Sequence, residues 1–228
     1  MPHFLAQAPT GPAVPLSDLV QTMHAHAARL RALHDRVGET YSQCSASTEA
    51  RKQWQDACSD FHGAYGDLFF PGGELAWEQF IDGSSADVGC ALAFLQADPW
   101  YHRSGYHKQV VWHRFKRTVL ARDELRLLEG VALDYLGRRV RREFWHMVRF
   151  VRLRGGADFW QRVEQMASDP VRSAPAIKAT WLVLARQNKP VHQAIANEVR
   201  RAGYQPGYQA VLDFRHIAVH WEGPGRRC

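Results

Sequence analysis

The residues best suited to bind a charged partner are concentrated between positions 103 and 154. This stretch contains 14 lysines and arginines against 5 aspartates and glutamates, whereas the rest of the chain has a small acidic excess. The net charge of +6 therefore comes from this one stretch. Clustered positive charge focuses an electric field that attracts negatively charged molecules. The segment predicts an acidic partner, which is either a protein or a nucleic-acid backbone.

Helical spacing gathers many of these charges on one side of a helix expected over 139–153. Apolar residues recur there at three- and four-residue steps and define a stripe that faces a core. At 3.6 residues per turn, the opposite side carries the following residues: Arg138, Arg142, Trp145, Arg149 and Arg152. Another helix, expected earlier in the chain over 104–119, contributes three more cations: Arg114, Lys116 and Arg117.

Arginine and tryptophan on one exposed ridge are typical of a docking surface. Arginine donates paired hydrogen bonds to phosphate or carboxylate, and tryptophan stacks on bases or anchors protein interfaces. The alternative is that neighbouring helices supply carboxylates that neutralise the arginines. The carboxylates available for this are Glu124, Glu129, Asp134 and Glu164.

Two groups of residues have side chains that are suited to metal binding or catalysis. His216 and His220 lie one helical turn apart, a spacing that can hold a metal, but no third ligand is indicated. The junction after Asp98 is crowded with side chains that would support acid–base chemistry if they lined a cleft: His102, Arg103, Tyr106 and His107. Neither a nucleophile–base pair nor a nucleotide-binding motif accompanies them, so we predict a non-catalytic protein without a cofactor.

The elements that must position these residues are all helical in pattern. Apolar positions recur at helical spacing from Leu16 onward, and no stretch shows the alternation of a strand. The expected helices, about nine to eleven in number, are 16–37, 45–66, 74–81, 85–96, 104–119, 123–137, 139–153, 157–167, 171–186, 190–202 and 207–220. The predicted fold class is all-α.

One domain is expected over 16–220. Residues 1–15 hold four prolines and predict a mobile arm, and 221–228 predict a flexible basic tail. The chain shows no secretory signal and no apolar run long enough for a bilayer, and its four cysteines form no C-x-x-C pair. These features predict a cytoplasmic protein with no membrane partner.

Two helix junctions share the same chemistry. Asp98-Pro99 and Asp169-Pro170 are each followed by an arginine, and the aspartate is expected to cap the incoming helix. This arrangement resembles the turn within HEAT-type helical repeats, and the segment 94–154 is also similar to uncharacterised bacterial helical-repeat proteins. The resemblance implies stacked antiparallel helix pairs, as a right-handed solenoid or an irregular array.

The resulting prediction is an interaction module or adaptor subunit of a bacterial assembly. An alternative is an enzyme, because the outline is similar to the alkylpurine DNA glycosylases of the HEAT fold. In that family tryptophans and an aspartate hold the damaged nucleotide, and the nearest match here, Asp158-Phe159-Trp160, has a different order. A second alternative is a toxin-neutralising or phage-defence accessory protein.

Overall fold

The computed structural model describes residues 14–84, 88–171 and 173–202, and within these ranges every regular element is a helix. The all-α fold class is confirmed. The ten helices are α1 (Leu16–Tyr41), α2 (Thr48–Leu68), α3 (Gly73–Asp82), α4 (Gly89–Ala97), α5 (Ser104–Phe115), α6 (Arg122–Gly137), α7 (Phe144–Arg154), α8 (Ala157–Ala167), α9 (Ala174–Arg186) and α10 (Val191–Ala202). The expected N-terminal arm up to residue 13, the helix at 207–220 and the tail at 221–228 lie outside the described residues.

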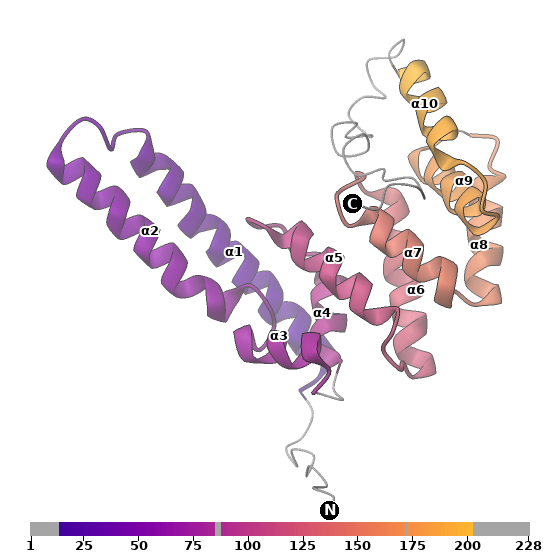
Figure 1. Cartoon of the computed structure of the whole chain (residues 1–228), viewed down its shortest axis with the longest axis horizontal. Coiled ribbons are helices and arrows are strands. Elements are labelled where there is room, and N and C mark those ends of the chain that lie inside the picture. The colour runs from indigo at the N-terminus through magenta and orange to yellow at the C-terminus, as the bar shows by residue number, and fades with distance from the viewer. Residues whose placement is uncertain (1–13, 85–87, 172, 203–228) are drawn as a thin grey trace, which may run out of the picture.

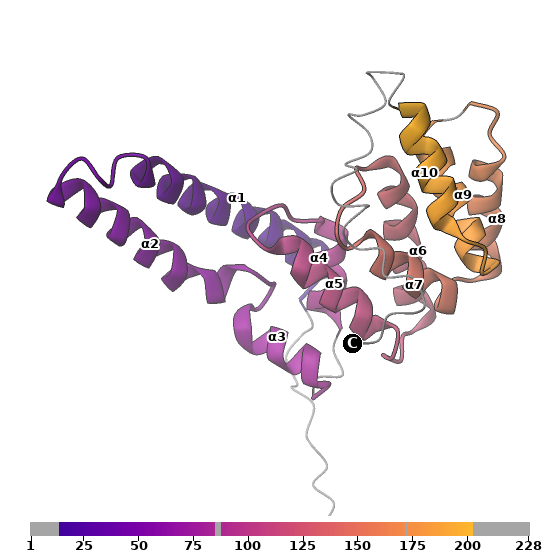
Figure 2. The ribbon, with the colours of Figure 1, turned by 45° about the horizontal axis from the view of Figure 1, so that its top comes forward.

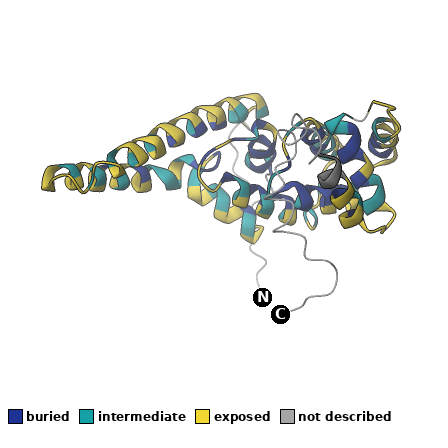
Figure 3. Cartoon of the chain, turned by 90° about the horizontal axis from the view of Figure 1, so that it is seen from above, coloured by how far each residue is buried: buried dark blue, intermediate teal, exposed yellow. Residues whose placement is uncertain are grey.

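The two longest helices form a hairpin that projects from the rest of the molecule. α1 and α2 lie antiparallel, and their far ends are exposed (Figures 1 and 3). The turn between them ends at Ser47, whose hydroxyl caps α2 by accepting a hydrogen bond from the Ala50 amide at 3.0 Å. Near its base α1 buries Met23, Ala27 and Leu30, whose helical spacing directs them to one side, and α1 packs there on α2 and α4.

A short buried helix anchors the hairpin to the body. All residues of α4 from Ala91 to Leu95 are buried, so α4 serves as a central core element. α4 ends at Asp98, whose backbone is left-handed with φ of 43°. Pro99 follows, and proline disfavours helical geometry at the residue before it, which fits the end of the helix at this point.

Helices α5 and α7 lie side by side and run in the same direction, with α6 connecting them (Figures 1 and 2). Their shared core includes Trp112 and Phe150, whose ring centroids are 5.1 Å apart. On its other side α7 packs against α9, where Phe144 and Trp145 meet Trp181. The α5–α6–α7 unit therefore brings together residues that are about 35 positions apart in the sequence.

The structure corrects two local expectations. α7 begins at Phe144 rather than at 139, because residues 138–143 form a linker in which Val140 is buried and the Arg138 carbonyl accepts a hydrogen bond from Lys178. The aspartates of the two Asp-Pro junctions do not cap the incoming helices. The side chain at the N-terminus of α9 that does so is that of Ser173, and the Asp98 carboxylate turns into the protein interior.

Candidate functional site

Two members of the predicted docking surface, one half-buried and one buried, have partners within the protein. Arg138 lies in the linker, and its Nη1 is 2.6 Å from Oδ2 of Asp98, so its charge is neutralised. Trp145 is only 7% exposed, and its ring stacks on that of Trp181 at 6.3 Å. The expected helix wheel was wrong at these positions because the helix starts later and because α7 is packed on two sides, against α5 and α9.

Two further predicted members face neighbouring loops. The Arg114 guanidinium lies against Gly83 at the end of α3, where it helps lower the pKa of Asp82. Arg152 donates a hydrogen bond to Oδ1 of Asn188 at 3.3 Å. Both residues have partners within the chain, so they contribute less to a free charged surface.

The remaining cations form an unneutralised cluster where α5 and α7 meet. Burial lowers the pKa of Lys116, and the charges of Arg149 and Arg117 lower it further. His113 lies beside these cations: burial lowers its pKa, and Lys116, Arg117 and Arg149 lower it further, which favours the neutral ring near pH 7. Within the described part of the chain no carboxylate forms an ion pair with any of these four residues.

The carboxylates considered as neutralising partners are engaged elsewhere. Glu124 accepts a hydrogen bond from the Ala121 amide, and Glu129 accepts one from the Gly156 amide, both at 2.6 Å. Asp134 reaches only Arg138, at 4.0 Å, while Glu164 pairs with Arg186. None of these four carboxylates therefore neutralises the positive charge near Arg149.

This cluster is one end of a longer strip of exposed and half-buried residues, which we call the α5–α7 seam. Its members are Tyr106, Val110, His113, Lys116, Arg117, Arg142 and Arg149. At the other end the Arg142 guanidinium stacks on the Tyr106 ring, 3.7 Å from the centroid, and the Arg142 carbonyl accepts a hydrogen bond from Gln109 at 3.3 Å. On α5, Tyr106 and His113 are separated by two helical turns, or about 10 Å along the helix axis.

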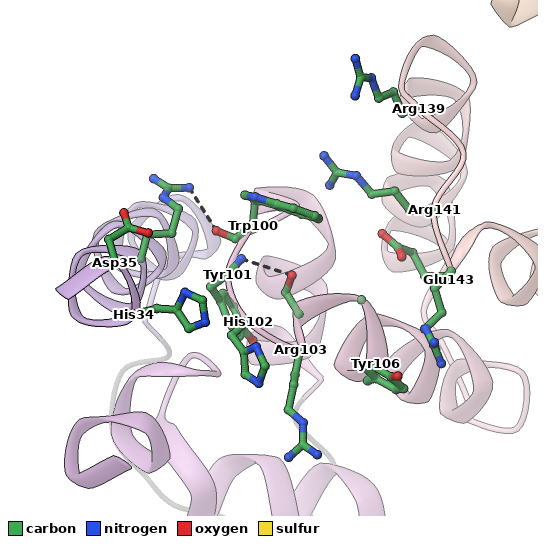
Figure 4. A pocket seen from close by; sticks show the side chains of 14 residues that line it. His34, Asp35, Trp100, Tyr101, His102, Arg103, Tyr106, Arg139, Arg141 and Glu143 are labelled. Carbon is green, nitrogen blue, oxygen red and sulfur yellow. Dashed lines mark hydrogen bonds between the residues drawn. The ribbon is translucent and has the colours of Figure 1, made fainter. Parts of the chain in front are cut away.

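The Tyr106 end of the seam opens into a cavity of about 790 Å³ (Figure 4). Three segments surround it: α1 with His34 and Asp35, the stretch 100–106, and the linker with Arg139 and Arg141. The cavity includes part of the junction that the sequence singled out. His102, Arg103 and Tyr106 line it, whereas Asp98 and His107 do not.

The cavity wall is positively charged and partly aromatic. Its arginines are Arg31, Arg103, Arg139, Arg141 and Arg142, whereas its carboxylates are Asp35 and Glu143. Trp100 is 58% exposed, and the Arg141 guanidinium lies 4.5 Å from its ring centroid. Stacking on an aromatic face fixes the plane of a guanidinium while its N–H groups stay available to a ligand.

A buried ionic cluster lies below the cavity. Lys108 is fully buried and donates to Asp98, and its Nζ is 3.8 Å from Oε1 of Glu143. The Tyr135 hydroxyl lies 2.9 Å from Oδ1 of Asp98. Burial raises the pKa of Asp98, but Lys108 and Arg138 outweigh it and hold the pKa below its usual value. The cluster ties α4, α5, α6 and the linker together.

The sequence analysis missed this cluster, although one signal for it was present. Lys108 stands three, four and seven residues before Val111, Trp112 and Phe115, so it falls on the core-facing stripe of its helix. A charged residue on such a stripe requires a buried partner.

His107 belongs to an aromatic cluster rather than to a reactive site. Burial is the main cause that lowers its pKa to about 4, so the ring is neutral near pH 7. Its ring lies 4.8 Å from Phe69 and 5.1 Å from Trp77, and its Nδ1 is 3.3 Å from the Tyr101 hydroxyl. This placement favours packing over acid–base chemistry at His107.

The other residues singled out from the sequence show no further assembled site. His216 and His220 lie outside the described residues, and within those residues no group of three or more potential metal ligands occurs. In the same ranges none of the helices combines the length and the apolar character needed to cross a bilayer. In the segment considered for glycosylase chemistry, Asp158 is exposed while Phe159 and Trp160 are buried.

Comparison with known proteins adds no relative. No protein-family model, no curated protein and no solved structure matches the chain. The function must therefore be inferred from the seam and the cavity themselves.

Proposed function

We propose that the protein is a non-catalytic helical binding module that holds a single nucleic-acid strand along the α5–α7 seam, as an adaptor within a larger assembly. The observation that carries the proposal is the unneutralised cluster of Lys116, Arg117 and Arg149, whose charges also lower the pKa of the neighbouring His113. Like charges held together weaken a fold, because they repel one another. A bound polyanion removes this repulsion and releases its own counterions.

Exposed aromatic residues favour a nucleic-acid strand over an acidic protein. Tyr106 is 50% exposed on the seam, and Trp100 stands at the cavity mouth. Unpaired bases stack on such rings, whereas the bases of a duplex are already stacked on each other. The Arg142 guanidinium is held on the Tyr106 ring, which orients its donors for phosphate. Arg141 is held on the Trp100 ring and also lies 3.8 Å from Oδ2 of Asp98 through its Nη1.

Fluorescence anisotropy with a labelled single strand of 20 nucleotides tests the proposal. The double variant Arg117→Glu with Arg149→Glu is expected to weaken binding at least about tenfold and to flatten its dependence on salt, because each lost phosphate contact lowers the slope by about 0.7. The matched control is Arg51→Glu with Lys52→Glu, which makes the same charge change on exposed residues of α2.

Three outcomes contradict the proposal. Equal losses in the two double variants show that net charge alone drives binding. Tighter binding of a duplex than of the single strand excludes a single-strand module. Tighter binding of a polyglutamate peptide of equal charge, at the same salt concentration, assigns the seam to an acidic protein instead.

A further inference from the structure

The cavity at the end of the seam has an unsatisfied acceptor in its wall. Glu143 lines the cavity, and its carboxylate points into it (Figure 4). Oε2 of this carboxylate is buried and has no hydrogen-bond partner among the described residues. A buried acceptor without a donor is costly, so a ligand that supplies an N–H or O–H gains affinity at this point.

The other carboxylate oxygen of Glu143 is already in use. Oε1 lies 3.2 Å from the Tyr135 hydroxyl and 3.8 Å from Lys108 Nζ. These contacts fix the carboxylate so that Oε2 is the oxygen left for a ligand. Gly105 packs closely against this oxygen, because a methyl group at that position would stand 3.2 Å from Oε2, tighter than an ordinary van der Waals contact.

The rest of the wall complements a planar ring that carries phosphate. Trp100 offers an exposed aromatic face, and Arg139 and Arg141 place positive charge on the linker side. The volume of about 790 Å³ is that of an ordinary small-molecule site. A ring, a hydrogen-bond donor and a phosphate are the three parts of a nucleotide.

We propose that the cavity binds one nucleotide whose base carries an exocyclic amino group, which donates to Glu143 Oε2. This inference deepens the proposed function and rests on it, since the nucleotide is the end of the strand held on the seam. Cytosine is favoured over uracil because the two pyrimidines differ at position 4, where cytosine has an amino donor and uracil a carbonyl oxygen. The carboxylate accepts from the first and repels the second.

Calorimetric titration with dCMP and dUMP, and anisotropy with 20-nucleotide strands of deoxycytidine or deoxyuridine, test this preference. We expect dCMP and the deoxycytidine strand to bind about tenfold more tightly than their uracil counterparts, as befits one hydrogen bond to a charged acceptor. Equal binding of the two mononucleotides overturns the inference, whatever the strands do.

Two variants connect the preference to Glu143. In Glu143→Gln the amide oxygen is expected to keep the Lys108 side, which turns the NH₂ group toward the cavity and abolishes or reverses the preference for cytosine. Gly105→Ala crowds Oε2 without changing any charge and is expected to abolish the preference. Its control is Gly63→Ala, an exposed helical position with no atom within 4 Å of the added carbon, where the preference stays intact.

The outcomes separate this inference from the proposed function. If the double variant Arg117→Glu with Arg149→Glu binds the strand as tightly as the wild type, the seam is not the binding surface and the proposed function is wrong. If the wild type binds cytosine and uracil nucleotides with equal affinity, the cavity does not recognise the base. The same conclusion follows if Gly105→Ala leaves the ratio of the two affinities unchanged. If Glu143→Gln does not fold, as judged by circular dichroism, Gly105→Ala decides alone.

Discussion

The basic segment contains two regions that use positive charge in opposite ways. In the buried ionic cluster, Lys108 is surrounded by Asp98 and Glu143, and its charge is satisfied inside the chain. On the α5–α7 seam, Arg117 and Arg149 stand beside Lys116, and no carboxylate of the described residues forms an ion pair with them. We expect the loss of a charge to destabilise the fold in the first region and to leave it nearly unchanged in the second. An excess of charge in a sequence must therefore be divided between these two uses before it is assigned to a surface.

The largest effect is expected from breaking the buried cluster. Lys108→Met leaves two buried carboxylates facing each other, and removal of one partner from a buried ion pair costs about 3–5 kcal/mol. Arg117→Met on the seam is expected to change the free energy of unfolding by less than about 0.5 kcal/mol. Urea denaturation of both variants measures the difference. Similar urea midpoints for the two variants would contradict the proposed difference between the buried cluster and the seam.

The pH dependence of stability is expected to show a smaller effect at the edge of the buried region. Burial lowers the pKa of His107 from 6.5 to about 4, so below pH 6.5 the unfolded chain binds a proton that the folded chain does not. Stability is therefore complete above pH 6.5 and falls as the pH drops toward 4, by about 2 kcal/mol between pH 7.5 and 5.

His107→Phe keeps an aromatic ring and removes the titrating group. This variant is expected to lose most of that pH dependence in chemical denaturation at the two pH values. An unchanged slope would mean that other histidines with lowered pKa values, such as His102 and His113, account for it.

The smallest effect is expected on the seam, and its sign is opposite. Arg149→Gln relieves repulsion from Lys116 and Arg117, so the free energy of unfolding should rise by about 0.3 kcal/mol. The same variant should lower the salt-dependence slope of strand binding by about 0.7. Thermal unfolding and anisotropy measure the two changes. A loss of more than about 1 kcal/mol of stability would place Arg149 with the structural charges instead.

Much of the helical pattern was predictable, because amphipathic periodicity is a local property. The segments 104–119 and 123–137 were expected as helices, and α5 and α6 occupy most of them. Whether a residue is buried or exposed is harder to predict when its helix packs against neighbours on two sides. Trp145 appears opposite the apolar stripe in the sequence, yet α9 covers that side, and periodicity does not show the second neighbour.

The cavity could not be predicted for a different reason. Its walls join His34 of α1 to Arg141 of the linker, which are more than 100 residues apart. Spacing within a segment says nothing about such a meeting. The sequence indicates the junction residues His102 and Tyr106. The role of Glu143 as an acceptor depends on the linker lying beside them, which spacing along the chain does not show.

The parallel arrangement of α5 and α7 has a thermodynamic consequence. Because α6 separates the two halves of the seam along the chain, the binding surface exists only while the native state persists. A ligand that recognises it therefore shifts the folding equilibrium by mass action, by about 2.7 kcal/mol at a hundred times its dissociation constant. Protection of the chain against heat and proteases by a nucleic-acid strand would thus report occupancy directly, without any label on either molecule.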